Sequence, residues 1–199
     1  MKLSLDTPAV SPVMLAKFCA IRRPSAFEGF GPRSYSASLL VNPEVPAEME
    51  FWLEVGRLFE ESVRLALVKL QVPEDEGLHR QTSPATEAPD GSRLLRFKLA
   101  EFRTSYERGR RDSVPQAPRI YGASGTKGPL FEGEVYGGAR LAVYFTPEPY
   151  AFRDKRTREC MGGLKLRLDM VAVHDPGSPP RRRSEGPDPS AYAHLEEPF

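Results

Sequence analysis

The chain has 199 residues, of which 40% are hydrophobic and 28% charged, and its formal net charge at pH 7 is +1. This size provides for one domain with a hydrophobic core, and no run of 18 apolar residues is present that would form a transmembrane helix. All 28 Lys and Arg residues precede residue 184, whereas four of the 27 Asp and Glu residues follow it, so residues 1–183 carry a net charge of +5. A basic body with an acidic tail is typical of a protein that handles a polyanion.

The first third of the chain is predicted to form two strands and a long helix. Residues 15–21 and 35–41 are the strands, separated by a stretch rich in Pro, Gly and Phe over 24–32. Apolar residues recur at three-to-four spacing over 46–70, which predicts a helix that packs on a sheet through one stripe. The stripe consists of Met49, Trp52, Leu53, Gly56, Phe59, Val63, Ala66, Leu67 and Leu70.

The remainder of the chain is predicted to be strands joined by polar loops. Residues 72–92 form a long loop rich in Pro, Glu, Ser and Thr, and residues 103–111 form a basic loop. Strands are expected over 93–102, 119–123, 139–145 and 164–172. Sixteen glycines and 20 prolines agree with a turn-rich β protein.

Three of these strands alternate between apolar and polar residues, which indicates one covered face and one open face. Leu95, Phe97 and Leu99 face inward in the first of them, for example. We expect the open faces to combine into one basic surface that bears an aromatic residue. This surface comprises Arg96, Lys98, Arg140, Tyr144, Lys165 and Arg167.

Cations and aromatic rings on one surface are what a single-stranded-DNA-binding protein needs, because cations neutralise phosphates and flat rings stack on bases of any sequence. The candidate phosphate contacts are Arg96, Lys98, Arg103, Arg108, Arg110, Arg111, Lys127, Arg140, Lys165 and Arg167. The candidate stacking residues are Phe102, Tyr106, Tyr121, Tyr136, Tyr144, Tyr150 and Phe152. The alternative is that the aromatic residues pack in the core and the cations are merely solvated.

Residues 176–199 are too rich in Pro, Gly, Ser and Arg to bury a core, so we expect a folded domain over 1–175 and a disordered tail over 176–199. The tail ends in Glu196, Glu197, Pro198 and Phe199. A terminal ring can enter a pocket of a partner protein while the carboxylates meet basic side chains. The run Arg181–Arg183 either contacts the DNA backbone or is a solvated linker segment.

Signals of catalysis are absent from the sequence, which predicts a protein that is not an enzyme. His79, His174 and His194 lack the spacing of metal ligands, and Cys19 and Cys160 stand alone. We expect reduced cysteines, no metal and no cofactor. Two other functions remain open, namely a module that binds only proteins and a metal-dependent nuclease.

Three segments resemble the bacteriophage single-stranded-DNA-binding proteins of the OB-fold type: residues 128–140 (GPLFEGEVYGGAR), 144–150, and 162–173 (GGLKLRLDMVAV). The tail that ends in Phe199 resembles those of phage and bacterial single-strand binders. The resemblance implies a mainly β protein, with an OB-like five-stranded antiparallel barrel and one long inserted helix.

The resemblance also implies a function in DNA replication, recombination and repair, in the cytoplasm of the infected bacterial host. The implied partners are single-stranded DNA and, through the tail, the phage DNA polymerase and the helicase/primase. A homodimer is left open, and the protein-binding alternative is an OB-fold module without direct DNA contact.

Overall fold

A computed structural model of the chain describes residues 2–27, 30–88, 90–107 and 110–179. It is mainly β, with one long helix, α1, over Pro46–Leu70. The strands are β1 (Ala9–Val10), β2 (Met14–Phe27), β3 (Phe30–Val41), β4 (Arg80–Thr82), β5 (Ala85–Glu87), β6 (Arg93–Ala100), β7 (Phe102–Glu107), β8 (Arg110–Pro115), β9 (Arg119–Gly122), β10 (Arg140–Arg153) and β11 (Cys160–Asp175). A 3-10 turn, η1, covers Gly125–Lys127.

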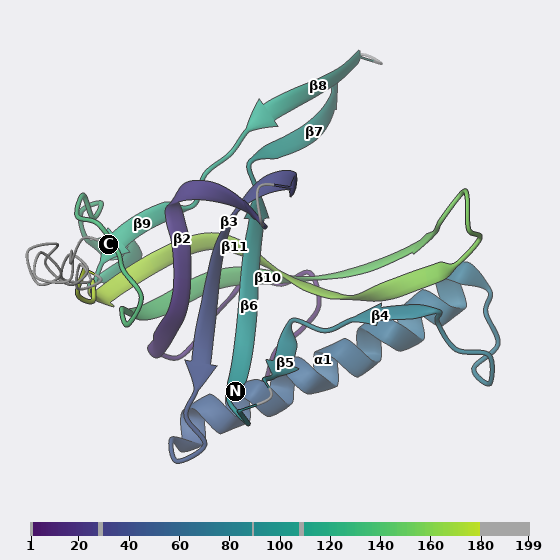
Figure 1. Cartoon of the computed structure of the whole chain (residues 1–199), viewed down its shortest axis with the longest axis horizontal. Helices are drawn as coiled ribbons and strands as arrows, with labels where there is room; N and C mark the ends of the chain where they lie inside the picture. Colours follow the sequence, from purple (N-terminus) through teal and green to yellow (C-terminus); the bar gives the residue numbers. More distant parts are fainter. Residues whose placement is uncertain (1, 28–29, 89, 108–109, 180–199) are drawn as a thin grey trace, which may run out of the picture.

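Five strands form a closed ring of hydrogen bonds, which makes a small barrel (Figure 1). β2 pairs antiparallel with β3, β3 with β6, and β10 with both β2 and β11. The ring closes where β6 runs parallel to β11, with Lys98 opposite Arg167. The predicted OB-like five-stranded barrel is confirmed, but this one pair is parallel where an antiparallel barrel was predicted. Alternation cannot distinguish the two, since side chains alternate in both kinds of pairing.

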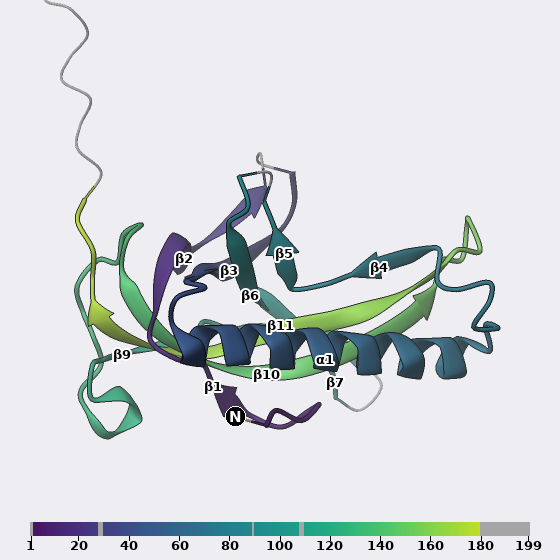
Figure 2. The ribbon, with the colours of Figure 1, turned by 90° about the horizontal axis from the view of Figure 1, so that it is seen from below.

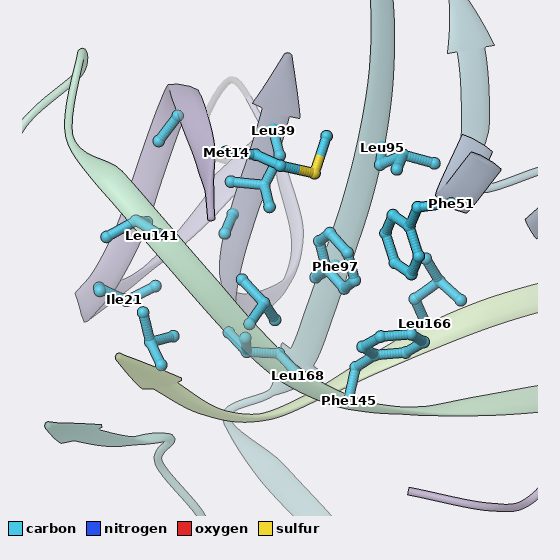
Figure 3. Packing of buried hydrophobic residues seen from close by; sticks show 14 of the residues in the cluster. Met14, Ile21, Leu39, Phe51, Leu95, Phe97, Leu141, Phe145, Leu166 and Leu168 are labelled. Atoms are coloured by element: carbon cyan, nitrogen blue, oxygen red, sulfur yellow. The ribbon is translucent and has the colours of Figure 1, made fainter. Parts of the chain in front are cut away.

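The barrel interior is filled by the inward side chains of the ring strands and by α1. Phe145 packs edge-on against Phe51 of the helix and Phe97 of β6, with ring centroids 5.7 and 5.2 Å apart (Figure 3). The inward residues of β6 and β11, such as Leu95 and Leu166, surround these rings. This packing fixes which side chains of each strand must face outward.

The helix spans the predicted residues, but its buried face differs from the predicted stripe. Phe51, Val55 and Leu58 are fully buried, whereas Leu53 is 64% exposed. Apolar side chains occur on more than one side of this helix, so their spacing identifies a helix without fixing its rotation. Figure 2 shows α1 running along β10 and β11, on one side of the barrel.

Strands β10 and β11 are 14 and 16 residues long, considerably longer than predicted. Their pairing continues from Leu141 opposite Val173 to Arg153 opposite Cys160, so both run beyond the barrel as a two-stranded arm (Figure 1). The end of α1 packs on this arm through a small cluster that includes Ala66 and Leu78. The arm therefore extends the outer surface of the barrel wall.

Two predicted loops contain strands. The basic segment 103–111 lies within a hairpin of β7 and β8 that forms a separate sheet and projects from the barrel (Figure 1). The segment 72–92 includes β4 and β5, which pair with β11 and β6. These strands were missed because neither the hairpin nor a three-residue strand needs a buried face with alternating apolar residues.

No helix in the described ranges is long and apolar enough to cross a membrane. Strand β11 ends at Asp175, next to the predicted domain boundary. The predicted tail beyond residue 179, including Arg181–Arg183 and Glu196 to Phe199, lies outside the described residues.

Candidate nucleic-acid interface

An open groove of about 1140 Å³ lies on the outer surface, where β6 and β11 meet. Its floor is formed by the outward side of these two strands, and one wall by Thr82, at the end of β4, with Ser83 and Pro84 after it. The base of the β7–β8 hairpin forms part of its rim. Six basic side chains line it, from four different strands: Arg33, Arg96, Lys98, Arg103, Lys165 and Arg167.

Strand register gathers the floor cations. Arg96 and Lys98 alternate with the buried Leu95, Phe97 and Leu99, so they must point outward. Partial burial, followed by repulsion from Arg96 and Lys165, lowers the pKa of Lys98 below its ordinary value of 10.5. The three cations therefore repel one another in the free protein, and an anion that entered the groove would relieve that repulsion.

Arg167 shares the groove but is already paired. Its Nε donates to Asp169 Oδ1 at 2.7 Å and its Nη2 to Thr146 Oγ1 at 3.0 Å, and its Nη1 donates to Glu148. The Thr146 hydroxyl also donates to Asp169, at 2.7 Å. Hydrogen bonding to Asp169 raises the pKa of the guanidinium. The single charge of Arg167 is consequently shared between two carboxylates in the floor, which leaves it less available to a phosphate.

Exposed groups lie along the rim beside the floor. Phe102 is 54% exposed and Arg103 is exposed, both at the base of the hairpin. Arg33 of β3 lies on the same groove, with Nη1 3.7 Å from Glu101 Oε1 and Nη2 donating to the Pro24 carbonyl at 3.1 Å. Arg33 was not predicted, because it follows a Pro/Gly-rich stretch that gave no sign of a strand.

Aromatic rings continue the groove onto the arm. Tyr150 and Phe152 of β10 are stacked, with centroids 6.3 Å apart and planes at 28°. The Nζ of Lys165 lies 4.6 Å from the Tyr150 ring centroid, so a groove cation and an arm ring are in direct contact. Phe152 is 48% exposed. A chain of phosphates in the groove would therefore have flat rings close to one of its ends.

Several predicted residues lie elsewhere, so the expectation of one shared surface is wrong for them. Arg140 is at the other end of β10, opposite Leu15 and Asp175. Tyr144 packs on η1, since a Cβ added at Gly125 would lie 2.7 Å from its hydroxyl. Alternation assigns a side chain to a face, but a long curved strand carries that face to distant parts of the molecule.

Other predicted residues also do not line the groove. Lys127 belongs to η1, and Tyr136 precedes β10, with its amide bonded to the Pro176 carbonyl at 2.9 Å. Tyr121 is half-buried in β9. In the hairpin, Tyr106 pairs with Arg111, and Arg110 begins β8, but the side chains of these three residues and the whole of Arg108 lie outside the described part of the chain.

Among the described residues, no three His, Cys, Asp or Glu side chains are grouped in a way that could hold a metal ion. The carboxylates of the groove, Glu148 and Asp169, are both bonded to Arg167. The groove therefore presents cations and rings, which suit binding of a polyanion with flat groups attached.

No protein-family model matches the chain, and no curated protein matches it. Among solved structures, it is similar to gp2.5, a single-stranded DNA-binding protein encoded by bacteriophage T7, with a TM-score of 0.66 and 18% identity over 89% of this chain and 97% of that one. It is also similar to the single-stranded DNA-binding protein from bacteriophage Enc34 in complex with single-stranded DNA. That match has a TM-score of 0.51 and 12% identity, over 86% of this chain and 88% of the other. At these identities the likeness defines the fold, which is OB-like as in gp2.5.

Proposed function

We propose that this protein binds single-stranded DNA with little sequence preference and performs no catalysis on it. The observation that carries the proposal is the cluster of Arg96, Lys98 and Lys165 in an open groove, where partial burial and then the two neighbouring cations lower the pKa of Lys98. Because the cations lie in the floor, two rings at one end and Phe102 on the rim, the groove can follow a sugar–phosphate backbone while bases stack at its margins.

The fold adds support to this function. The solved structures named above are single-stranded DNA-binding proteins of bacteriophages, and one of them is a complex with single-stranded DNA. In the present chain, strands of the ring carry basic side chains on their outer side, and such side chains can bind the phosphates of DNA. We therefore extend the proposal to the coating and protection of single strands during phage DNA replication, recombination and repair in the infected bacterial host.

We further propose that the acidic tail recruits replication proteins. Glu196 to Phe199 combine carboxylates with a terminal ring, and a partner such as the phage DNA polymerase or helicase/primase would supply a basic pocket. The tail carries charge of the opposite sign to the groove, so it also has the means to compete with DNA for the cations. The folded domain over 1–175 would then bind DNA, and residues 176–199 would bind proteins.

The test is binding of fluorescently labelled oligonucleotides, single-stranded and duplex, measured by anisotropy. We expect preference for single strands and affinity that falls as salt rises. The variant R96A/K98A should lose most of this affinity. The matched control, R64A/K69A, removes one Arg and one Lys from exposed positions on α1 that do not line the groove.

Three results would overturn the proposal. The first is the absence of oligonucleotide binding at low salt, which would favour a module that binds only proteins. The second is an equal loss of DNA affinity in R96A/K98A and R64A/K69A, which would show that the groove is not the DNA-binding site. The third is cleavage of the DNA in the presence of Mg²⁺, which would indicate a nuclease.

A further inference from the structure

Phe18 of β2 is 64% exposed, although it belongs to a strand of the barrel. Its neighbours in sequence show why. Met14, Ala16 and Ile21 are buried, and Cys19 is packed against the core. Strict alternation from Ala16 would point Phe18 inward and Cys19 outward, so the strand must contain an irregularity that exchanges them.

The exchange occurs at a break in the β2–β3 register. Ala16 pairs with Leu39 and Phe18 with Ser38, so β2 has one extra residue between the two pairs. This shift turns Phe18 out and Cys19 in, and burial raises the pKa of the Cys19 thiol to about 11. Bulges of this kind are frequent near functional sites, where they redirect a side chain at the expense of a local break in the ladder.

The register also relates Phe18 to the groove. Phe18 pairs with Ser38, and Ser38 pairs with Arg96, so the exposed ring and a floor cation lie in one row across three neighbouring strands. Two strand spacings separate them, roughly 10 Å. The next row consists of Ala20, Ser36, Lys98 and Arg167.

The surface between the ring and the cations is made of small side chains. Ser36 and Ser38 of β3 occupy the outward register positions between β2 and β6, where Ser36 is half-buried and Ser38 only 8% exposed, and Ala20 lies beside Phe18. Ser34 continues this line to the groove, which it lines. A nucleotide strand could cross such a surface without displacing a large side chain. It would then contact Phe18 on β2, beyond the serines of β3.

We propose that Phe18 stacks on a base of bound single-stranded DNA, so that the DNA path continues from the groove over β3 onto β2. This inference rests on the function proposed above and adds a stacking position on β2, on the other side of the groove from Tyr150 and Phe152. The cations of the floor would lie between the two aromatic positions and hold the intervening phosphates.

The test compares F18A, F18L and F18W with the parent protein in binding of a single-stranded oligonucleotide. Removal of one stacked base contact should lower affinity by about five-fold or more. F18W should retain affinity and F18L should not, because leucine keeps the apolar volume and loses the flat ring. The control is L53A, which removes another side chain that is 64% exposed, on α1.

A second measurement separates stacking from a general effect of the substitution. The salt dependence of affinity should be the same in F18A and the parent, because no phosphate contact is lost. An oligonucleotide of the same length with abasic sites should bind both proteins equally. Thermal melts establish whether each variant folds. If F18A does not fold, the comparison of F18L with F18W still tests the stacking of Phe18.

Failure of this inference and failure of the proposed function give different results. If the parent protein does not bind single strands, the proposed function is wrong. If the parent binds and F18A or F18L binds equally well, only the role of Phe18 is wrong. Normal DNA binding by F18A together with loss of a protein partner would assign Phe18 to a protein contact and would also overturn the inference.

Discussion

Lys98 and Arg167 lie opposite each other across the parallel seam of the barrel, but their electrostatic surroundings are opposite. Burial and the cations Arg96 and Lys165 lower the pKa of Lys98. Hydrogen bonds to Asp169 raise the pKa of Arg167. A phosphate that enters the groove would therefore stabilise the charged form of Lys98. Arg167, in contrast, must weaken or break its bonds to the carboxylates before it can bind a phosphate.

The lowered pKa of Lys98 predicts an alkaline loss of DNA affinity. A phosphate favours the charged ammonium, so binding raises the pKa of Lys98 from its depressed value in the free protein. Above that depressed value, binding takes up a proton, and affinity falls as pH rises, beginning below the ordinary lysine pKa of 10.5. Titration of oligonucleotide affinity from pH 7 to 10 measures this effect.

The control for this titration is K98R, because a guanidinium stays protonated throughout the range. K98R should bind at pH 7 with affinity similar to that of the parent and should lose most of the alkaline decline. An equal decline in K98R and the parent would show that other groups cause it.

Single substitutions of Arg96 and Lys165, for which the described part of the chain supplies no carboxylate partner, should reduce the salt dependence of binding. Each phosphate neutralised on a single strand contributes about −0.7 to the slope of log K against log salt. R96A and K165A should each make the slope shallower by roughly 0.7. Anisotropy titrations at several salt concentrations give the slopes. K69A on α1 is the control and should leave the slope unchanged; slopes unaltered by R96A and K165A would exclude these residues as phosphate contacts.

R167A should behave differently from these variants. It removes one positive charge and also leaves the carboxylates of Glu148 and Asp169 without their main partner. We therefore expect a greater loss of affinity than in R96A, since two anions then face the DNA. In the triple variant R167A/E148Q/D169N much of the affinity should return. A loss in R167A equal to that in R96A, with no recovery in the triple variant, would contradict this account.

The sequence predicted the parts of the fold that bury a regular apolar face. The helix over 46–70 and the alternating strands that contain Leu95, Leu141 and Leu166 have such faces, and all are present. The strands of the β7–β8 hairpin form their own sheet and do not pair with the main sheet, so no pattern of core residues reveals them. Strand lengths were underestimated because the arm leaves the barrel and its residues, such as Phe152, need not be buried.

The candidate site was predicted in part for the same physical reason. Arg96, Lys98, Lys165 and Arg167 alternate with core residues, which fixes their outward direction, and the closed ring brings them together. The position of Phe18 depends on a register shift between β2 and β3, and a register shift reflects three-dimensional packing rather than the local pattern of residues.

Gly163 is required for the contact between β11 and β4. A Cβ at this position would lie 2.3 Å from the Thr82 carbonyl oxygen, and the φ of Gly163 is +152°. Because the clash is with backbone, G163A should destabilise the protein by about 1–3 kcal/mol. It should also weaken DNA binding, since Thr82 forms part of the groove wall.

Thermal or urea unfolding measures the effect of G163A. The matched control is G56A in α1, where an added Cβ would meet nothing within 4 Å. Alanine favours a helix over glycine, so G56A should stabilise the protein by up to about 1 kcal/mol. The two Gly-to-Ala substitutions are thus expected to change the free energy of unfolding in opposite directions. Destabilisation by both would indicate that the contacts at each glycine do not determine the change in stability.

Removal of Glu196 to Phe199 should separate the two proposed binding functions. The deletion removes Glu196 and Glu197 and leaves the groove cations in place, so single-stranded DNA should bind with equal or greater affinity. Contact with the DNA polymerase or helicase/primase should be weakened, which pull-down and surface plasmon resonance with the purified partner can measure. F199A, which keeps both carboxylates, should weaken the protein contact without strengthening DNA binding. If the truncated protein instead loses DNA affinity, the tail contributes to the DNA site and the proposed division between domain and tail is wrong.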